Sequence, residues 1–269
     1  MKLKSYIVDT TLRDGEQSAG IAFNKEEKVK LALQMDGAGI YQIEAGIPAL
    51  GASEQEAIKE IMSKKKQAII STWSTLNKES IAAAIECNPD IVHISVPVSY
   101  VYIYSKLKKN KQWMRGQMLE CVSYAKEQNQ EVTIGFEDAS RADISFIISL
   151  CVALQELGIK RIRYADTVGV MTPHTIRDVV ANIRNYTNLE IEIHAHNDFG
   201  MAVANSLEAA KSGARFIDCT FMGIGERAGN CDFLKFVKAS QEILDLGLDR
   251  RAIYEVKENV LQTIKGHGK

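Results

Sequence analysis

The segment Gly158-Ile159-Lys160-Arg161-Ile162 decides the fold class of this chain, because it joins the end of a helix to the start of a strand. The glycine ends the helical pattern, and the apolar residues after it begin the next strand. The same arrangement recurs at Gly39-Ile40-Tyr41-Gln42-Ile43 and at Gly213-Ala214-Arg215-Phe216-Ile217. This weak internal repeat is typical of a chain in which helices and parallel strands alternate.

Eight strand-like runs, rich in β-branched residues, can be counted along the chain. They lie near residues 5–10, 40–45, 68–73, 90–96, 131–136, 160–165, 190–195 and 215–220. Apolar residues recur at helical spacing between them, and Asn24 with Glu27 and Ser53 with Glu56 carry the signature of a capping box.

Eight such units predict an α/β fold, a single (β/α)₈ barrel over about residues 5–248 of one domain that covers residues 1–269. One further helix is expected near residues 251–264. An open, doubly wound sheet has the same alternation of helices and strands. Polar residues at nearly every strand end favour the closed barrel, because barrels gather their chemistry there.

Composition limits the possible classes of function. The 269 residues include 33 Lys and Arg and 34 Asp and Glu, which argues against binding to nucleic acid or to a membrane surface. The five cysteines form no Cys-x-x-Cys motif, as expected for reduced thiols. We expect no signal peptide and no membrane span, hence a cytoplasmic protein. The lysine runs at 64–66 and 106–111 are expected to be solvated, and His174 and His267 are assigned no role.

Two polar motifs near opposite ends of the chain predict a metal site. The stretch Asp9-Thr10-Thr11-Leu12-Arg13-Asp14-Gly15-Glu16-Gln17 places an acid where the first strand meets a glycine turn. In His194-Ala195-His196, two imidazoles share one face of the seventh strand. Asp14, His194 and His196 would meet at the barrel mouth, and this donor set suits Zn²⁺, Mn²⁺, Fe²⁺ or, with water, Mg²⁺. The alternative is a pair of hydrogen-bonded strand histidines without a metal.

Other strand ends supply further candidates. Arg13 could form a surface ion pair with Asp14, but its place directly after a buried strand suits a group that binds a carboxylate or a developing enolate. Glu137 and Asp138 end the fifth strand. Glu137 is the candidate acid–base group, whereas Asp138 could equally be a solvated loop acid.

A glycine-rich loop, Gly223-Ile224-Gly225-Glu226-Arg227-Ala228-Gly229-Asn230, follows the eighth strand. Its backbone N–H groups could approach a phosphate or acyl group, with Gly223, Gly225 and Arg227 as the expected contacts. A tight turn would need the same glycines. Asn230 could add a neutral oxygen ligand to the metal.

Taken together, these motifs resemble the DRE-TIM metallolyase superfamily, specifically its isopropylmalate synthase and homocitrate synthase group. The resemblance covers nearly all of the chain and is carried by Asp9 to Gln17, by His194-Ala195-His196-Asn197-Asp198-Phe199-Gly200 and by Gly223 to Asn230. The stretches His93-Ile94-Ser95-Val96-Pro97-Val98-Ser99 and Tyr164-Ala165-Asp166-Thr167-Val168-Gly169 are most similar to the homocitrate synthases of nitrogen-fixing bacteria. The lysine-pathway branch usually has Glu in place of Asp14.

The resemblance implies condensation of acetyl-CoA with a 2-oxo acid, 2-oxoglutarate, followed by thioester hydrolysis to homocitrate and CoA. Asp14, His194 and His196 would hold a divalent metal, with Mg²⁺, Mn²⁺ and Zn²⁺ not distinguished. Arg13 would neutralise charge on the keto oxygen, and Glu137 would help to enolise the acetyl group. Thr167 would hydrogen-bond the carboxylate of the oxo acid. The pocket would be lined by Gln17, Glu44, His93 and Ser95, which would either support the contacting residues from behind or set the chain length of the acceptor.

The sequence departs from the group's pattern in two places. Members normally continue past the barrel with an extension that dimerises and reaches over the partner's active site, whereas this sequence stops soon after the barrel. Trp73-Ser74-Thr75 stands where an arginine or cysteine is common. We therefore expect one subunit of a split synthase, with a second polypeptide supplying the lid, or else a homo-oligomer.

Three alternative functions remain open from the sequence. One is a stand-alone acyl-CoA lyase or aldolase of the 3-hydroxy-3-methylglutaryl-CoA lyase type. Another is an isopropylmalate- or citramalate-type synthase that uses a different 2-oxo acid. The third is a non-catalytic regulatory or scaffold subunit, against which the presence of every metal-site residue argues.

Overall fold

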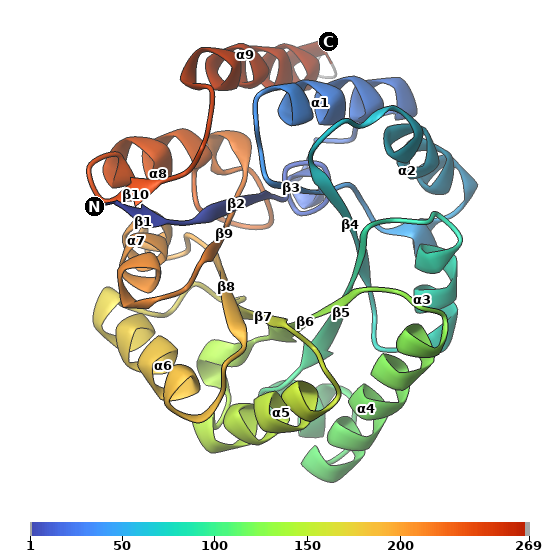
Figure 1. The fold of residues 1–269 in the computed structure, drawn as a ribbon, viewed down its shortest axis with the longest axis vertical. Coiled ribbons are helices and arrows are strands. Elements are labelled where there is room, and N and C mark those ends of the chain that lie inside the picture. Colours follow the sequence, from blue (N-terminus) through green and yellow to red (C-terminus); the bar gives the residue numbers. More distant parts are fainter. Residues whose placement is uncertain (1, 267–269) are drawn as a thin grey trace.

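In a computed structural model that describes residues 2–266, eight parallel strands close into a barrel surrounded by helices (Figure 1). Each strand pairs with the next, and the last pairs with the first, where Tyr6 lies opposite Phe216. The predicted α/β barrel is confirmed, and every predicted strand begins and ends within two residues of an observed one. The barrel strands are β2 (Tyr6–Asp9), β3 (Gln42–Glu44), β4 (Ile69–Ser74), β5 (Ile91–Pro97), β6 (Val132–Glu137), β7 (Arg161–Asp166), β8 (Glu190–Ala195) and β9 (Phe216–Cys219).

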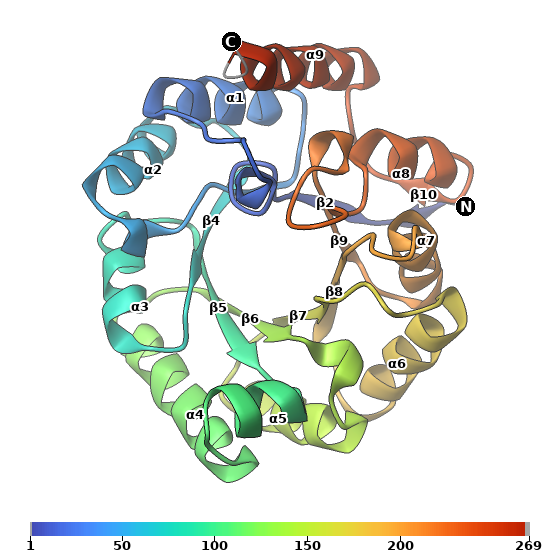
Figure 2. The same ribbon diagram turned by 180° about the vertical axis from the view of Figure 1, so that it is seen from behind.

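The helices lie outside the barrel, as both faces of the ribbon diagram show (Figures 1 and 2). The additional helix α9 (Arg250–Gly266) is present near its predicted position and packs against the first helix. Two short strands, β1 (Leu3–Lys4) and β10 (Leu244–Asp245), pair beside the barrel. No helix in residues 2–266 is long and apolar enough to cross a membrane. The other helices are α1 (Lys25–Gly37), α2 (Ala52–Lys64), α3 (Lys78–Ile85), α4 (Lys111–Glu127), α5 (Ile144–Glu156), α6 (Pro173–Tyr186), α7 (Ala202–Ser212) and α8 (Phe233–Ser240).

Local signals set many of the helix starts, but one predicted cap is absent. The capping box of Asn24 and Glu27 is present at the start of α1. The capping box predicted at Ser53 is wrong, because α2 already begins at Ala52 and no side chain caps it. Gly51 precedes the helix with φ of 124°, a conformation that favours glycine, so the helix starts one residue before the predicted cap.

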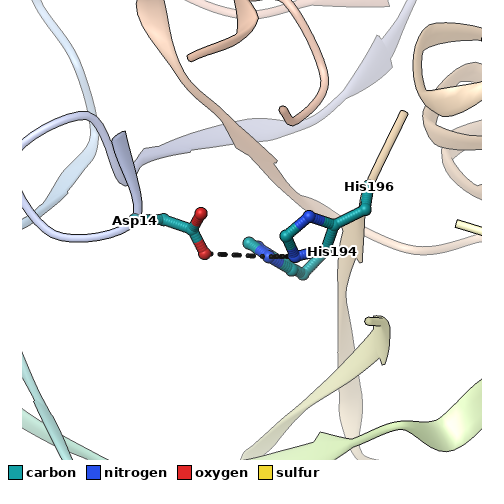
Figure 3. A group of neighbouring side chains, drawn as sticks. All are labelled: Asp14, His194 and His196. Carbon is teal, nitrogen blue, oxygen red and sulfur yellow. Dashed lines mark hydrogen bonds and ion pairs between the residues drawn. The ribbon is translucent and has the colours of Figure 1, made fainter. Parts of the chain in front are cut away.

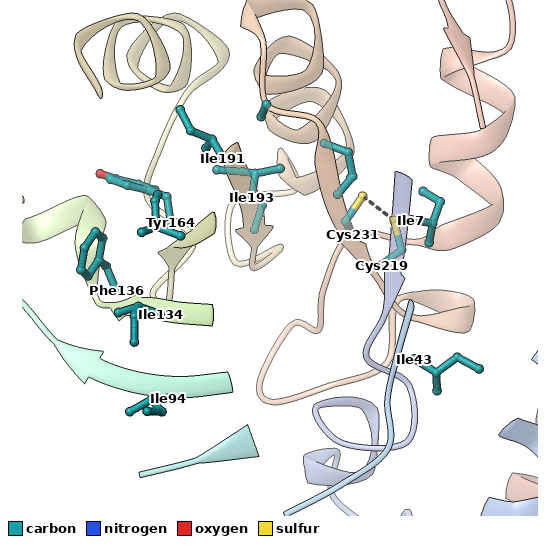
Figure 4. Packing of buried hydrophobic residues seen from close by; sticks show 14 of the residues in the cluster. Ile7, Ile43, Ile94, Ile134, Phe136, Tyr164, Ile191, Ile193, Cys219 and Cys231 are labelled. Atoms are coloured by element: carbon teal, nitrogen blue, oxygen red, sulfur yellow. Dashed lines mark hydrogen bonds between the residues drawn. The ribbon is translucent and has the colours of Figure 1, made fainter. Parts of the chain in front are cut away.

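The two faces of the strands differ in polarity, and this difference positions the site. Ile191 and Ile193 of β8 belong to the hydrophobic core, which is shown in part in Figure 4. Their neighbours Glu192 and His194 are also buried but are polar. Since successive side chains of a strand point to opposite faces, the apolar residues pack against the helices and the polar ones fill the barrel interior.

Candidate active site

Asp14, His194 and His196 meet at the carboxyl ends of the strands, as the sequence predicts (Figure 3). Asp14 lies in the turn after β2, whereas His194 is on β8 and His196 directly follows it. The Nε2 atom of His194 lies 3.3 Å from Asp14 Oδ2 and 3.2 Å from His196 Nε2. All three side chains are buried, and one ligand atom from each lies within 4.8 Å of the others.

The hydrogen bonds around these three residues fit a cation. Asp218 Oδ2 accepts a hydrogen bond of 2.9 Å from His194 Nδ1, because a carboxylate can only accept. The remaining ring nitrogen of His194 is directed toward Asp14 and His196, and in the neutral imidazole it would offer its lone pair to a metal ion there. Asn230 donates to Asp14 Oδ1 at 2.7 Å, and its own Oδ1 is buried without a hydrogen-bond partner among residues 2–266. One carboxylate, two imidazoles and a free amide oxygen form a donor set that suits a divalent metal.

Without a metal, the pKa values of these three side chains shift in different directions. Burial alone would lower the pKa of His194, but hydrogen bonds to Asp14 and Asp218 raise it to about 9. Burial and the charge of His194 lower the pKa of His196 to about 3. Although burial opposes its ionisation, the cation of Arg13 keeps the pKa of Asp14 well below its ordinary value. The cluster thus holds one positive charge between two close ring nitrogens, at the place where a metal ion would carry it.

Arg13 is buried and does not form the surface ion pair that was the alternative interpretation. Its Nη1 atom lies 2.9 Å from Asp14 Oδ2 and donates to Gln17 Oε1 at 3.2 Å, while Nε pairs with Glu44. The guanidinium also lies 5.8 Å from the centre of the Trp73 ring. Arg13 is therefore held on three sides next to the candidate metal ligands.

A cavity of about 170 Å³ lies in the barrel mouth and contains most of the predicted site residues. Five residues that line it, Trp73, Gly135, Arg163, Ala165 and Glu226, were not assigned a role from the sequence. Among them, Arg163 could have been found, because it lies four residues before Thr167 and so on the same strand face. The full lining consists of Arg13, Asp14, Gln17, Trp73, His93, Ser95, Gly135, Glu137, Arg163, Ala165, Thr167, His194, His196 and Glu226.

Of the two roles expected for Glu44, its position fits support of a neighbouring side chain and not direct contact with the substrate. It is fully buried and is not part of the cavity lining. One of its oxygens pairs with Arg13 Nε and the other with Arg163 Nη2 at 2.6 Å. Although burial opposes ionisation, these two arginines lower its pKa from the ordinary value. Glu44 therefore supports Arg13 from beneath the cavity.

The end of β6 separates its two acids. Glu137 lines the cavity and accepts a hydrogen bond of 3.3 Å from Ser95 Oγ. Asp138 is buried and has φ of 59°. It accepts two hydrogen bonds from Arg141, so the alternative prediction of a solvated loop acid is wrong. Its backbone N–H donates to Thr167 Oγ1 at 2.8 Å. Asp138 therefore orients the loop around Thr167, and only Glu137 faces the cavity.

The glycine-rich loop packs close to the candidate metal ligands. A Cβ at Gly225 would lie 2.1 Å from Asn230 Nδ2 and 2.9 Å from Asp14 Oδ1, so this glycine lets the backbone approach the candidate metal site. Arg227 pairs with Asp198 at 2.9 Å and donates to the Thr167 carbonyl. Neither Gly223, Gly225 nor Arg227 lines the cavity, whereas Glu226 of the same loop does.

The remaining sequence predictions concern the surface. The lysines of the two runs at 64–66 and 106–111 are exposed or partly exposed. His174 is exposed near the start of α6 and lies 3.4 Å from Asp178, away from the cavity. His267 lies outside the residues that the structure describes.

Comparisons with known sequences agree on one family. The family model described as HMGL-like matches residues 4–260. The homocitrate synthase subunit alpha of Clostridium pasteurianum is 51% identical over 237 residues, which cover 88% of this chain and 88% of that protein. The 2-isopropylmalate synthase 2 of Caldanaerobacter subterraneus is 41% identical, with 95% of this chain and 67% of that protein covered. The homocitrate synthase of Frankia alni is 40% identical, with 90% and 69% covered.

Solved structures of lower identity share the fold. The HMG-CoA lyase of Bacillus subtilis superposes with a TM-score of 0.87 at 18% identity, over 98% of this chain and 96% of that chain. The hydroxymethylglutaryl-CoA lyase of Pseudomonas aeruginosa gives a TM-score of 0.86 at 18% identity, over 98% and 95%. At this level of identity the likeness concerns the barrel alone.

Proposed function

Because the chain belongs to the HMGL-like family, we propose that it is an acyltransferase that condenses acetyl-CoA with 2-oxoglutarate and hydrolyses the thioester to homocitrate and CoA. Its similarity to proteins named homocitrate synthase supports the choice of reaction and acceptor. The observation that carries the proposal is that Arg13, Glu137 and the three candidate metal ligands line one cavity. A cation, an acid–base group and a metal site are what this condensation needs.

The metal would be held by Asp14, His194 and His196, with the free amide oxygen of Asn230 beside them. When bound, it would act as a Lewis acid on the keto oxygen of the acceptor. Among residues 2–266, the hydrogen bonds of Arg13 use Nε and Nη1, which leaves Nη2 for a ligand. Arg13 would neutralise the charge that develops on the acceptor oxygen, as a preorganised cation in a partly desolvated site.

The other reactant would meet Glu137, which lines the same cavity. Its carboxylate is held by Ser95 Oγ and would accept a proton from the acetyl methyl group, directly or through a water. Thr167 lines the cavity, and its hydroxyl would bind the carboxylate of the acceptor. His93 lines the floor as a neutral side chain, because burial lowers its pKa to about 3, and would contact the far end of the acceptor together with Ser95.

We further propose that the chain functions as one subunit of a synthase with two kinds of polypeptide. The similar Clostridium protein is named as a subunit. Large apolar side chains are also exposed in the loops after the barrel strands, with Leu50 72% and Phe199 64% exposed. A second polypeptide seated over these loops would cover the exposed side chains. In the same set of loops, the exposed apolar residues include Tyr100, Val101 and Val170.

The test of the reaction is thiol release from acetyl-CoA by the purified chain with Mn²⁺ or Mg²⁺ and either 2-oxoglutarate, 2-oxoisovalerate or pyruvate. We expect release with 2-oxoglutarate only, abolished by EDTA and absent in His196→Ala. Release with a different acceptor would correct the substrate. Cleavage of 3-hydroxy-3-methylglutaryl-CoA without release in any synthase assay would replace the proposal with a lyase.

The test of the subunit proposal is gel filtration and assay with and without the product of the adjacent gene. We expect a larger complex and a higher rate when both polypeptides are present. Full activity of the isolated chain, unchanged by the second polypeptide, would contradict this part of the proposal. Self-association of the chain alone at full activity would identify a homo-oligomer instead.

A further inference from the structure

Buried charged side chains form a closed circuit inside the barrel. Each member pairs with the next through an ion pair or a hydrogen bond, and the last pairs with the first. All are at most 8% exposed. In order, the members are Asp14, Arg13, Glu44, Arg163, Asp218 and His194.

One half of this charged circuit connects Arg163 to Arg13. Arg163 Nη2 lies 2.6 Å from Glu44 Oε2, and the other oxygen of Glu44 pairs with Arg13 Nε. Arg13 and Arg163 therefore share one carboxylate, with one arginine on each oxygen. Because both Glu44 oxygens are occupied, a shift of Arg163 changes the geometry available to Arg13.

The other half connects Arg163 to the candidate metal site. Arg163 Nε lies 2.9 Å from Asp218 Oδ2, and the same oxygen lies 2.9 Å from His194 Nδ1. His194 Nε2 then returns to Asp14 Oδ2 at 3.3 Å. Within the circuit, Arg163 is thus the cation that contacts both the carboxylate behind Arg13 and the carboxylate behind His194.

We propose that Arg163 is a positioning residue that aligns Arg13 and the metal ligand His194 at the same time, through Glu44 and Asp218. The role rests on the proposed function, in which Arg13 and the metal act on one acceptor oxygen. A planar guanidinium suits this role because its N–H groups leave in fixed directions and it keeps its charge when buried. Carboxylates that hold a ligating histidine by its second nitrogen are known to tune metal affinity.

Arg161 provides a matched control on the same strand. It is also buried and points to the same face, two residues before Arg163. Its Nη2 donates to Gln42 Oε1 at 2.6 Å, and its guanidinium lies 4.2 Å from the centre of the Phe216 ring. Its ion pair is with Glu192, which also pairs with Arg163 Nε but is not a member of the charged circuit. Arg161→Gln therefore removes a buried arginine from the barrel but none of the pairs that make up the circuit, and it leaves the pair between Glu192 and Arg163 in place.

The experiment is a calorimetric titration of Mn²⁺ into the purified full chain without substrates, together with thermal unfolding in EDTA. We expect Arg163→Gln to weaken Mn²⁺ binding by about 10- to 100-fold, and Arg161→Gln to leave it unchanged. The EDTA melts should show that both variants fold. Because no substrate is present, this result does not depend on which reaction the protein catalyses.

A second variant covers the case in which Arg163→Gln fails to fold. Arg163→Lys keeps the charge but loses the fork that bridges two carboxylates, so we expect a folded protein with weakened Mn²⁺ binding. In the synthase assay, both variants should also lower kcat, since Arg13 is misaligned. Mn²⁺ affinity equal to that of the wild type in a folded Arg163→Lys or Arg163→Gln variant would overturn the proposal.

Discussion

Gly135 on β6 lies directly against the imidazole of His93 on β5. A Cβ at residue 135 would lie 2.3 Å from His93 Nε2 and 2.8 Å from Cε1. The ring is held in this place, because its Nδ1 lies 2.9 Å from Thr133 Oγ1. Both residues line the cavity, so the missing side chain of Gly135 provides the space in which His93 reaches the cavity floor.

Gly135→Ala should therefore destabilise the protein and weaken substrate binding. The added methyl group forces His93 from its hydrogen bond, and overpacking of this kind lowers the free energy of unfolding by about 1–3 kcal/mol. Since His93 lines the cavity, the KM for the 2-oxo acid should rise as well. Urea denaturation and steady-state kinetics measure both effects. Gly116→Ala is the control, because it lies in α4 and an added Cβ would meet no atom within 4 Å beyond its chain neighbours and the backbone of its own helix, so it should not destabilise the protein.

Arg13→Ala should lower kcat/KM at least a hundredfold. The lost electrophilic interaction is of the type that contributes about 3–4 kcal/mol to barrier lowering. Thiol release from acetyl-CoA measures the rate, and circular dichroism checks the fold. Arg177→Ala removes an exposed arginine of α6 and should retain the rate of the wild type. Near-normal turnover of Arg13→Ala would refute the role assigned to this cation.

Asn230→Ala should weaken metal binding. The change removes the hydrogen bond of 2.7 Å to Asp14 Oδ1 and the amide oxygen that has no other partner in the described part of the chain. Loss of a group that supports a metal ligand typically lowers affinity about 10- to 100-fold. Titration of Mn²⁺ without substrates gives the measurement. Asn182→Ala on the exposed side of α6 is the control, and equal affinities for the two variants would contradict the prediction.

Asp9 should make stability depend on pH. Burial raises its pKa to about 7, and its Oδ2 has no hydrogen-bond partner among residues 2–266. In the unfolded chain this carboxyl titrates near its ordinary value of 3.8. Between these two values the folded state binds more protons than the unfolded state, so the contribution of Asp9 to the free energy of unfolding falls as pH rises. The full change is of order 4 kcal/mol.

Asp9→Asn replaces the protonated carboxyl with a neutral amide of the same shape. We expect the two proteins to have similar stability near pH 4 and the variant to be more stable at pH 8. Urea denaturation of both proteins across this range gives the difference, in which the titration of all other groups cancels. A difference that stays constant with pH would show that Asp9 keeps its ordinary pKa.

The sequence by itself determined the order of the elements and the place of the chemistry. The glycines that follow helices, such as Gly39, Gly158 and Gly213, are local features of the sequence. All three have the positive φ that ends a helix. The meeting of Asp14 with His194 and His196 was also predictable, since the carboxyl ends of all strands converge at one mouth of a barrel. These properties depend only on neighbouring residues and on the closure of the sheet.

Only the tertiary structure decided which buried charges pair. Alternation along a strand predicts the face on which Arg163 lies, but its partner Glu44 is 119 residues away on a strand that is not its neighbour in the barrel. The contact between Gly135 and His93 likewise depends on the register of two adjacent strands. Pairing across a barrel is set by register, tilt and closure together, and no local pattern of residues contains that information.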